Sequence, residues 1–403
     1  MIEFLSLLIQ PVVQQYLIEH EHDDERELIL RQKEILGLPA STIAIQLLGR
    51  RKAKSKLPTW HNAKGIVYPP AINLEQCSSE ATGLYKLSII KKLIDKSDSS
   101  AVDLTGGLGV DSFFLSKAFN TVYFVEPNNE LLKIAEHNHH QLEANNVIYH
   151  TKTAEAFLET TQLHFSFAFI DPSRRDNSRK VFKLSDCIPD IVSIQDKLLT
   201  ISRYLLIKAS PLLDIQQALR ELIHVKKVFV VSVGNECKEL LFLSEHGFTE
   251  KVELSAVDLN SQGDIKSSFT FFLDDEKKAN PPQSEPLKFL YEPNTAILKA
   301  GAFKLVTEKY AVNKLSANTH LYTSDHLIAD FPGKTLQVEI LNPDSKKIKS
   351  LFRGGLANVI TRNYPLKAEQ LKKKFKLKDG GDKYLIGFSS DKKKHLAICS
   401  RIQ

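Results

Sequence analysis

Cysteine is scarce in this chain of 403 residues. The four cysteines lie far apart and form no C-x-x-C pair; they are Cys77, Cys187, Cys237 and Cys399. Structural zinc sites and disulfide frameworks both need cysteines at closer or repeated spacing. We therefore expect no metal site and no disulfide bond, and we expect reduced thiols in a cytoplasmic protein.

Long apolar runs are also missing, and so is a basic leader. No stretch provides the roughly 20 apolar residues that a membrane-spanning helix needs. The first ten residues, MIEFLSLLIQ, include an acid at Glu3 and no basic side chain, which is not the pattern of a secretory signal. The sequence thus predicts no membrane association.

Neither sign of charge dominates the chain as a whole. The net charge is +6, from 54 basic and 48 acidic side chains, so the chain is not a uniform polycation. Hydrophobic residues make up 42% of it, which is enough to build buried cores. At this length we expect about two to four domains. The position of the charge therefore carries more information than its total.

The most informative stretch is Ala101–Glu126, AVDLTGGLGVDSFFLSKAFNTVYFVE. A short apolar run ends in a glycine turn, a helix is predicted from about Val110, and a second apolar run ends on Glu126. A turn without side chains lets the backbone approach a ligand closely, and the N–H groups at a helix start favour a polar or anionic group. An acid after the second strand usually holds ribose hydroxyls in a nucleotide fold.

The glycine spacing narrows the kind of nucleotide. A dinucleotide site follows G-x-G-x-x-G, which the turn G-G-L-G does not fit. Instead, Asp103 is followed four and six positions later by Gly107 and Gly109. This pattern resembles motif I of class I S-adenosylmethionine methyltransferases, especially the D-L-x-x-G-x-G form of RNA-modifying members, with Thr105 at the usual first glycine. A glycine-rich turn in any buried βαβ unit is the alternative.

The resemblance implies a set of contacts to S-adenosyl-L-methionine. They are Asp103, Thr105, Gly106, Gly107, Gly109 and Glu126 around the turn, Glu155 in a loop that often faces the adenine, and Asp171 beside the methyl group. Polar residues before the turn either border the cofactor or act as caps and surface groups; they are Gln76, Ser79, Thr82, Tyr85 and Lys86. The clustered histidines His137, His139 and His140 point to different faces of a predicted helix, which argues against a metal site.

A second polar stretch, FSFAFIDPSRRD, follows a predicted strand at Phe165–Ile170. Asp171 lies at the same carboxyl edge as the glycine turn, where open α/β sheets bind ligands. The stretch resembles motif IV of class I methyltransferases, with Ser173 and Arg174 replacing a proline and an aromatic residue. Because the guanidinium groups of Arg174 and Arg175 suit phosphate or carboxylate, we predict Asp171 and Arg174 as catalytic residues. An Asp–Arg pair that only closes the loop is the alternative.

Strands and helices alternate through the middle of the chain, which predicts an α/β fold with a doubly wound, mostly parallel Rossmann-like sheet. The further predicted elements are strands at Val147–Tyr149, Tyr204–Lys208 and Lys227–Val233, a helix at Cys237–His246, and a late strand pair at Val252–Leu259 and Ser268–Leu273. Lys208 either faces the substrate or is a surface lysine with a buried stem.

The first 72 residues are predicted to be mostly helical, with a proline-marked linker near residues 58–72. A basic cluster that includes Arg50 and Arg51 lies next to Trp60. This combination suits phosphate contact with base stacking. The exposed end of a helix, where cations suit the helix dipole, explains it equally well.

Charge of one sign gathers near the C-terminus. Between Lys346 and Lys394 there are fifteen basic and four acidic residues, a net charge of +11, so the rest of the chain is net acidic. Strands and helices are predicted here in the order β-α-β-α-β-β. A local excess of this size on a small folded unit is typical of a surface that binds a phosphate backbone. A lysine-rich solvated surface is the alternative.

Taken in order, LEQCSSEATGLYK, DLTGGLGVDS, FVEPN, IDPSRRD and LNPDSKKIKSLFRGG resemble a bacterial family of class I methyltransferases with a THUMP-like C-terminal domain. The resemblance implies four domains: an N-terminal helical domain at 1–72, the methyltransferase domain at 73–275, a small ferredoxin-like domain at 280–333 and a basic THUMP-like domain at 334–403. It implies methylation of structured RNA, either tRNA or rRNA. A small-molecule or protein methyltransferase, and a non-catalytic RNA-binding protein that keeps the cofactor fold, are the alternatives.

Overall fold

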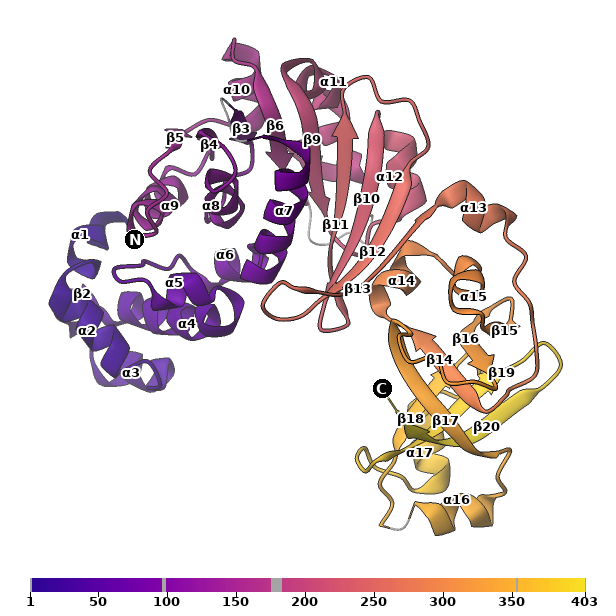
Figure 1. Cartoon of the computed structure of the whole chain (residues 1–403). Coiled ribbons are helices and arrows are strands. Elements are labelled where there is room, and N and C mark those ends of the chain that lie inside the picture. Colours follow the sequence, from indigo (N-terminus) through magenta and orange to yellow (C-terminus); the bar gives the residue numbers. More distant parts are fainter. Residues whose placement is uncertain (1, 96–98, 175–182, 353, 403) are drawn as a thin grey trace. The chain divides into compact units, whose positions relative to one another are not determined.

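The computed structural model describes residues 2–95, 99–174, 183–352 and 354–402. The chain forms two compact units, which are labelled by element in Figure 1. The first unit contains the residues up to Gly234 with Lys238–Lys251 and Leu259–Lys266, and the second contains Asn235–Cys237, Val252–Asp258 and the residues from Ser267 on. Each unit is described by itself below.

The N-terminal region is helical, as predicted. Its elements are α1 (Leu5–Leu8), α2 (Pro11–Glu19), α3 (Glu25–Arg31), the small strands β1 (Glu34–Ile35) and β2 (Leu38–Pro39), α4 (Ala40–Lys56) and α5 (Pro58–Asn62). Their apolar side chains pack in one core with α8 (Val110–Ser116) and α9 (Asn129–Gln141), which belong to the α/β part. These helices are therefore built onto the α/β part of the first unit.

The linker predicted near residues 58–72 is wrong. Ile66, Val67 and Tyr68 are buried in this shared core. The Gln46 amide donates to the Tyr68 carbonyl and accepts from its N–H, each over 2.8 Å, and the Asn138 side chain bonds Val67 in the same way. This segment is therefore an ordered connection. Its buried backbone N–H and C=O groups form hydrogen bonds with side chains, as burial requires.

The basic cluster beside Trp60 does not form a base-stacking surface. Trp60 is only 1% exposed, and its ring lies edge-on to Phe113 with the ring centres 4.7 Å apart. Arg50 pairs with Glu21 over 2.8 Å, and Arg51 pairs with Glu25. A buried indole cannot receive a base, so the stacking interpretation of this cluster is wrong.

The first unit contains most of a nine-stranded sheet with the order β13-β12-β10-β11-β9-β6-β3-β4-β5. The parallel strands are β5 (Val147–His150), β4 (Thr121–Val125), β3 (Ser100–Asp103), β6 (Phe165–Ile170) and β9 (Ser202–Ala209). The remaining strands are β11 (Glu236–Glu245), β10 (Val225–Val233), β12 (Glu253–Leu259) and β13 (Ile265–Phe272). The predicted doubly wound, mostly parallel sheet is therefore confirmed.

Helices cover both faces of this sheet. Right-handed crossovers place α8 and α9 on one face, where α7 (Glu80–Leu93) packs on α8. The chain then returns through α10 (Ala154–Thr160) and α11 (Ile191–Ile201), which contact each other on the opposite face. Two further helices are α6 (Ala71–Gln76) and α12 (Ile215–Glu221). The direction of winding reverses at β3 and β6, and a ligand site is expected outside the strand ends at that point.

The helix predicted at Cys237–His246 is wrong, because this segment is strand β11, antiparallel to β9. Leu240, Leu241, Phe242 and Leu243 are all buried, which a strand covered on both faces permits. The turn before β11 begins with two residues at positive φ, +57° and +66°, within the dipeptide Gly234–Asn235. A Gly-Asn pair between two apolar runs is a hairpin signal, and it could have corrected the prediction.

The second unit contains a seven-stranded sheet with the order β15-β16-β14-β17-β20-β19-β18. Its strands are β14 (Phe289–Pro293), β15 (Asn313–Ser316), β16 (Thr319–Ser324), β17 (Gly333–Leu341), β18 (Asn358–Arg362), β19 (Lys383–Ser389) and β20 (Lys394–Arg401). Its helices are α13 (Leu273–Lys278), α14 (Thr295–Ala300), α15 (Leu305–Tyr310), α16 (Ser345–Leu351) and α17 (Ala368–Phe375). The element order predicted from residue 334 onward is present, and the strands on both sides of this residue share one sheet.

Candidate functional site

A cavity of about 1280 Å³ opens at the carboxyl ends of the parallel strands in the first unit. The sequence-predicted residues that line it are Thr105, Gly106, Gly107, Gly109, Glu126, Glu155 and Asp171. They come from the ends of β3, β4 and β6 and from the start of α10. The structure therefore brings together the two stretches that resemble motifs I and IV, although more than 40 residues of sequence separate them.

The glycine turn is shaped by two demands on its backbone. Gly109 has a φ of +82°, and an added Cβ there would lie 2.6 Å from the His139 ring. Gly107 has a φ of +55°, but an added Cβ would meet only the Thr105 carbonyl oxygen, at 3.7 Å. Gly109 is thus required by packing, whereas Gly107 is bare on the side of the turn that opens to the cavity.

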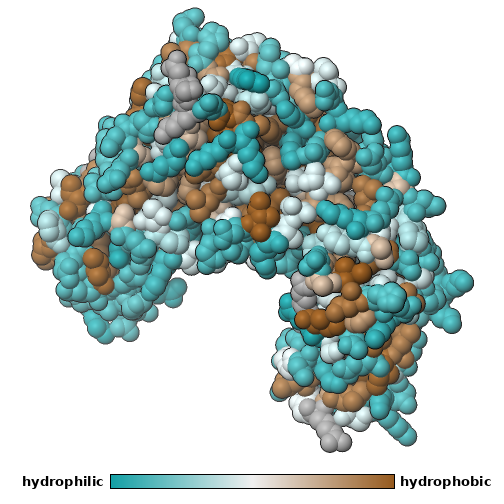
Figure 2. Space-filling model, in the orientation of Figure 1, coloured by the Kyte–Doolittle hydropathy of each residue, from teal (hydrophilic) through white to brown (hydrophobic). Residues whose placement is uncertain are grey.

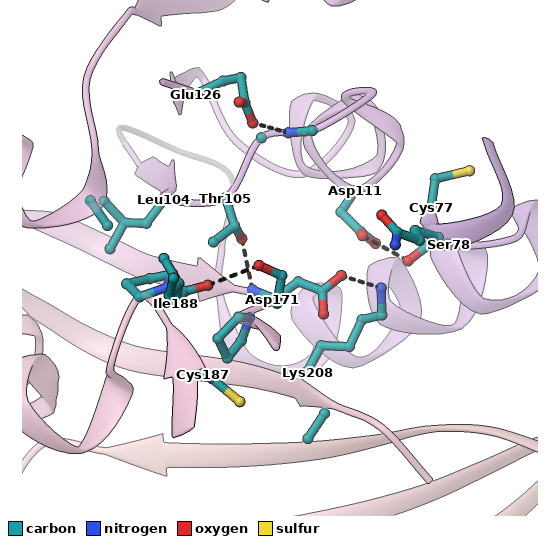
Figure 3. A pocket seen from close by; sticks show the side chains of 18 of the residues that line it. Cys77, Ser78, Leu104, Thr105, Asp111, Glu126, Asp171, Cys187, Ile188 and Lys208 are labelled. Carbon is teal, nitrogen blue, oxygen red and sulfur yellow. Dashed lines mark hydrogen bonds and ion pairs between the residues drawn. The ribbon is translucent and has the colours of Figure 1, made fainter. Parts of the chain in front are cut away.

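Glu126 is the acid at the end of β4, and it is 9% exposed. One carboxylate oxygen accepts from the Gly107 N–H over 2.9 Å, and the other accepts from the Asn128 N–H over 2.9 Å. Figure 3 shows its carboxylate hydrogen-bonded to the backbone of the turn. Two backbone donors fix this side chain, and its remaining lone pairs are available to hydroxyl groups of a ligand.

Asp103 does not line the cavity. It is 1% exposed and accepts from the Ser112 hydroxyl over 2.5 Å and from the Thr105 N–H over 3.0 Å. Burial raises the pKa of Asp103 to about 7, and the negative charges of Asp111 and Asp171 add to this effect. The carboxyl group stabilises the turn from inside, and a direct cofactor contact from Asp103 has no support in this geometry.

Thr105 joins the turn to the motif IV strand end. Its hydroxyl oxygen accepts from the Asp171 N–H over 2.7 Å. The Asp171 carboxylate pairs with the Lys208 ammonium, which is 12% exposed and projects from β9 (Figure 3). Burial lowers the pKa of Lys208, but the carboxylates of Asp171, Asp111 and Glu239 raise it above its ordinary value overall. Lys208 is therefore a charged residue of the cavity wall, and its predicted contact with the substrate stays a prediction.

Two predicted residues stand apart from this group. Glu155 lines the cavity from the first turn of α10, whose N-terminus is capped by the Thr153 hydroxyl. The side chain of Arg174 and the whole of Arg175 lie outside the described residues. The catalytic role predicted for Arg174 therefore stays a prediction.

Asp111 is a cavity residue that the sequence does not single out. It lies in the first turn of α8 and accepts from the Ser78 hydroxyl over 2.7 Å. Lys86 of α7 pairs with Asp111 over 2.9 Å and with Glu239 over 3.0 Å. Of the polar residues noted before the turn, Gln76 lines the cavity and Ser79 caps α7, whereas Lys86 is buried.

The charged side chains that line the cavity fit S-adenosyl-L-methionine. Carboxylates outnumber ammonium groups among the described lining residues, with Asp111, Glu126, Glu155, Asp171 and Asp186 against Lys183, Lys208 and Lys238. A wall with this sign of charge favours a ligand with a net positive charge, and a sulfonium with an amino-acid group carries one. Glu126, the acid predicted to hold the ribose, and the bare Gly107 line the same cavity.

Metal and membrane signals are absent from the described part of the chain. Among residues 2–95, 99–174, 183–352 and 354–402, no three His, Cys, Asp or Glu side chains gather in a way that would hold a metal ion. None of the described helices has the length and apolar character that crossing a bilayer requires. His139 is buried, and its ring nitrogens contact the Gly109 carbonyl and the Tyr149 hydroxyl.

Comparison with known families identifies two C-terminal domains. Residues 289–332 match a ferredoxin-like domain family, and residues 337–401 match a THUMP domain-like family. These ranges lie within the predicted segments 280–333 and 334–403. A search of curated proteins finds no match.

Solved structures similar to this chain include a presumed methyltransferase from Porphyromonas gingivalis W83. It is 29% identical, the match covers 99% of this chain and 99% of that one, and the TM-score is 0.86. SMU.1697c, a presumed methyltransferase from Streptococcus mutans in complex with SAH, is 17% identical over 40% of this chain and 96% of its own, with a TM-score of 0.32. An rRNA methylase from Streptococcus thermophilus is 16% identical over 40% and 95%, with a TM-score of 0.30.

The match along nearly the whole chain agrees with the resemblance stated from the sequence motifs. The C-terminal domain matches agree with the predicted domain order. The chain accordingly has the fold of a class I methyltransferase, followed by a ferredoxin-like domain and a THUMP-like C-terminal domain.

Proposed function

We propose that this methyltransferase uses S-adenosyl-L-methionine to methylate structured RNA, either tRNA or rRNA. The observation that carries the cofactor part is the Glu126 carboxylate. It is held by the N–H groups of Gly107 and Asn128 at the rim of the cavity, with lone pairs left for a vicinal diol. An acid fixed in this way at the end of the second parallel strand is the arrangement that receives a ribose.

Each end of the cofactor has candidate partners in the chain. Glu126 would accept from the ribose hydroxyls, and the segment Thr153–Glu155 would border the adenine. The glycine turn would lie along the methionine part. The cofactor supplies a methyl group activated by a sulfonium.

Asp171 and Lys208 would position the acceptor. The Asp171 backbone is tied to Thr105, and its carboxylate is tied to Lys208, so its orientation is fixed from two sides. A carboxylate fixed in this way can accept a hydrogen bond from the group that is to be methylated. Methyl transfer needs in-line placement more than covalent help, and positioning of this kind is worth several orders of magnitude in rate. Arg174 is proposed to contact a phosphate or carboxylate of the substrate.

The C-terminal domain supports RNA as the substrate class. Leu371 and Phe375 bury one side of α17, whereas Lys373 and Lys374 on the same helix are exposed. Exposed lysines contact phosphates and position a nucleic acid without reading its bases. The THUMP-like match points the same way, because THUMP domains usually accompany RNA-modifying enzymes.

The proposal is tested by mass spectrometry of RNA nucleosides. Total tRNA and rRNA from cells with and without the gene are digested, and the methylated nucleosides are compared. We expect one methylated nucleoside to disappear with the gene and to return with a wild-type copy but not with a Glu126→Ala copy. RNA that is unchanged, together with a methylated protein or small molecule, would contradict the RNA part of the proposal. Salt-sensitive RNA binding without methyl incorporation would contradict catalysis.

A further inference from the structure

A buried charge network lies behind the cavity wall, next to the glycine turn. Lys86 is 3% exposed, and its ammonium contacts the Ser78 hydroxyl over 3.0 Å, Asp111 over 2.9 Å and Glu239 over 3.0 Å. These three contacts use all three N–H donors of the ammonium. The network joins α7, α8 and β11, which the folded first unit brings together.

The network is not balanced in charge. One ammonium faces two carboxylates, and buried carboxylates are costly unless they are compensated. Lys208 is electrostatically coupled to Asp111, but its ammonium already pairs with Asp171. Although burial raises the pKa of Asp111, Lys86 and Lys208 hold it below its ordinary value, so the group is ionised at neutral pH. Within the set of Lys86, Asp111 and Glu239, one negative charge is therefore left over.

Asp111 is the member of the network that presents this charge to the cavity. Its side chain is 13% exposed and lines the cavity, whereas Glu239 is 3% exposed and does not line it. One Asp111 oxygen pairs with Lys86 and is buried, whereas the other accepts from Ser78 and, as an oxygen of an ionised carboxylate, can accept a further hydrogen bond. Figure 3 shows Asp111 beside Ser78 and away from Glu126.

The sheet order indicates which part of the ligand reaches Asp111. Glu155 follows β5, Glu126 directly follows β4, and Asp111 follows the turn after β3. An adenosine that lies across the ends of β5 and β4 directs its 5′ substituent toward β3. In the proposed cofactor, this substituent ends in an α-amino acid, whose ammonium is a cation of the required size.

We propose that Asp111 binds the α-ammonium group of the cofactor's methionine part, and that Lys86 and Glu239 are positioning residues that keep its carboxylate aimed at the cavity. This inference rests on the proposed function and names a contact within the same site. It also explains why a fully buried lysine lies between two acids directly behind the turn.

Calorimetric titration of the full chain with two ligands tests the proposal. S-adenosylhomocysteine retains the amino-acid group, and 5′-methylthioadenosine lacks it, whereas both contain the ribose. We expect Asp111→Asn to weaken S-adenosylhomocysteine binding about tenfold to a hundredfold and to leave 5′-methylthioadenosine binding unchanged. Glu126→Ala is the matched control, and it should weaken both ligands.

Two further comparisons distinguish the loss of the proposed contact from a folding defect of the variant. The analogue of S-adenosylhomocysteine that lacks only the α-amino group should bind wild type more weakly, and Asp111→Asn should not weaken it further. Glu239→Gln, at a site outside the cavity wall, should weaken S-adenosylhomocysteine several-fold and spare 5′-methylthioadenosine. A merely structural role of this network would lower both affinities together.

Equal losses for both ligands in Asp111→Asn, or no loss for either, would overturn the inference and leave the proposed function standing. Failure of wild type to bind either ligand would instead contradict the proposed function, and the inference would fall with it.

Discussion

The cavity of the first unit, counting the buried network behind its wall, and the outer face of α17 in the second unit both contain lysines, but in opposite settings. Lys86 and Lys208 are 3% and 12% exposed, and each contacts a fixed carboxylate. Lys373 and Lys374 are exposed. Buried charges need partners of defined geometry because desolvation is costly, whereas exposed charges act at a distance and are screened by salt.

This difference suits the two regions to two kinds of ligand. A buried, paired network presents one arrangement of charge and suits a single small ligand of matching shape. An exposed basic face tolerates many geometries and suits a phosphate backbone. Substitutions in the first region should therefore change ligand affinity or folding stability with little dependence on salt, and substitutions in the second should change the salt dependence of RNA binding.

The largest expected effect is at Glu126. Glu126→Ala removes the acceptor for two ribose hydroxyls, and each hydrogen bond to a charged group contributes about 1.5–3 kcal/mol. We expect S-adenosylmethionine affinity to fall by at least about a hundredfold, measured by calorimetry, with the RNA affinity unchanged in gel-shift titrations. A parallel loss of RNA affinity would contradict the claim that the cavity and the C-terminal domain bind their ligands independently.

Two buried groups of the first unit should respond to pH in opposite directions. Burial lowers the pKa of His139 from 6.5 to about 4. Between these values His139 is protonated in the unfolded chain but neutral in the folded chain. The free energy of unfolding therefore decreases by about 3 kcal/mol as pH falls from 6.5 to 4. Burial raises the pKa of Asp103 from 3.8 to about 7, and its contribution is lost as pH rises over that interval.

The variants His139→Gln and Asp103→Asn serve as controls for each other. Urea unfolding from pH 4.5 to 7.5 should show that His139→Gln gains stability relative to wild type as pH falls. Asp103→Asn should gain stability relative to wild type as pH rises. Slopes of the same sign for both variants would contradict the burial described here.

A smaller effect should separate the two glycines of the turn. Gly109→Ala places a Cβ 2.6 Å from the His139 ring at a φ of +82°, and we expect about 2 kcal/mol of destabilisation. Gly107→Ala meets no close atom, and the left-handed backbone alone costs about 1 kcal/mol. Thermal unfolding measures both changes in stability. Calorimetry measures the affinity for the cofactor, and only Gly107→Ala should lower this affinity by more than its loss of stability explains.

The smallest effect is expected on α17. Changing Lys373 and Lys374 together to Gln should weaken RNA binding several-fold and flatten the plot of log affinity against log salt by about one for each phosphate that is no longer bound. Lys372→Gln is the control, because this ammonium already contacts Glu369 and Asp379 over 2.7 Å each. An equal change from the control variant would show that pairing on this face does not limit phosphate binding.

Local pattern predicted much of the fold and part of the site. Glycine spacing, the acid Glu126 and the strand ending at Asp171 follow from short stretches in which neighbouring residues determine the backbone. The same holds for the C-terminal order, where apolar alternation and helix caps are local signals. The hairpin before β11 also had a local signal, the pair Gly234–Asn235, but the apolar run after it resembles a buried helix segment.

The rest of the site depends on contacts between distant residues. Lys86 and Glu239 are 153 positions apart, so no window of sequence reveals their contact. Asp103 was assigned to the cofactor because it begins the motif, whereas its carboxylate turns inward to Ser112. Trp60 lies next to basic residues in sequence but inside the core in space. On the face drawn in Figure 2, the surface of the N-terminal helices is largely hydrophilic. Side-chain direction is set by tertiary packing, which a linear pattern does not contain.

A crystal structure of the protein with S-adenosylhomocysteine tests the central claim most directly. We predict the ribose hydroxyls on the Glu126 carboxylate, the homocysteine along the turn at Gly107, and the α-ammonium on Asp111. A ligand bound elsewhere, or bound in this cavity with its ribose away from Glu126, would contradict the account.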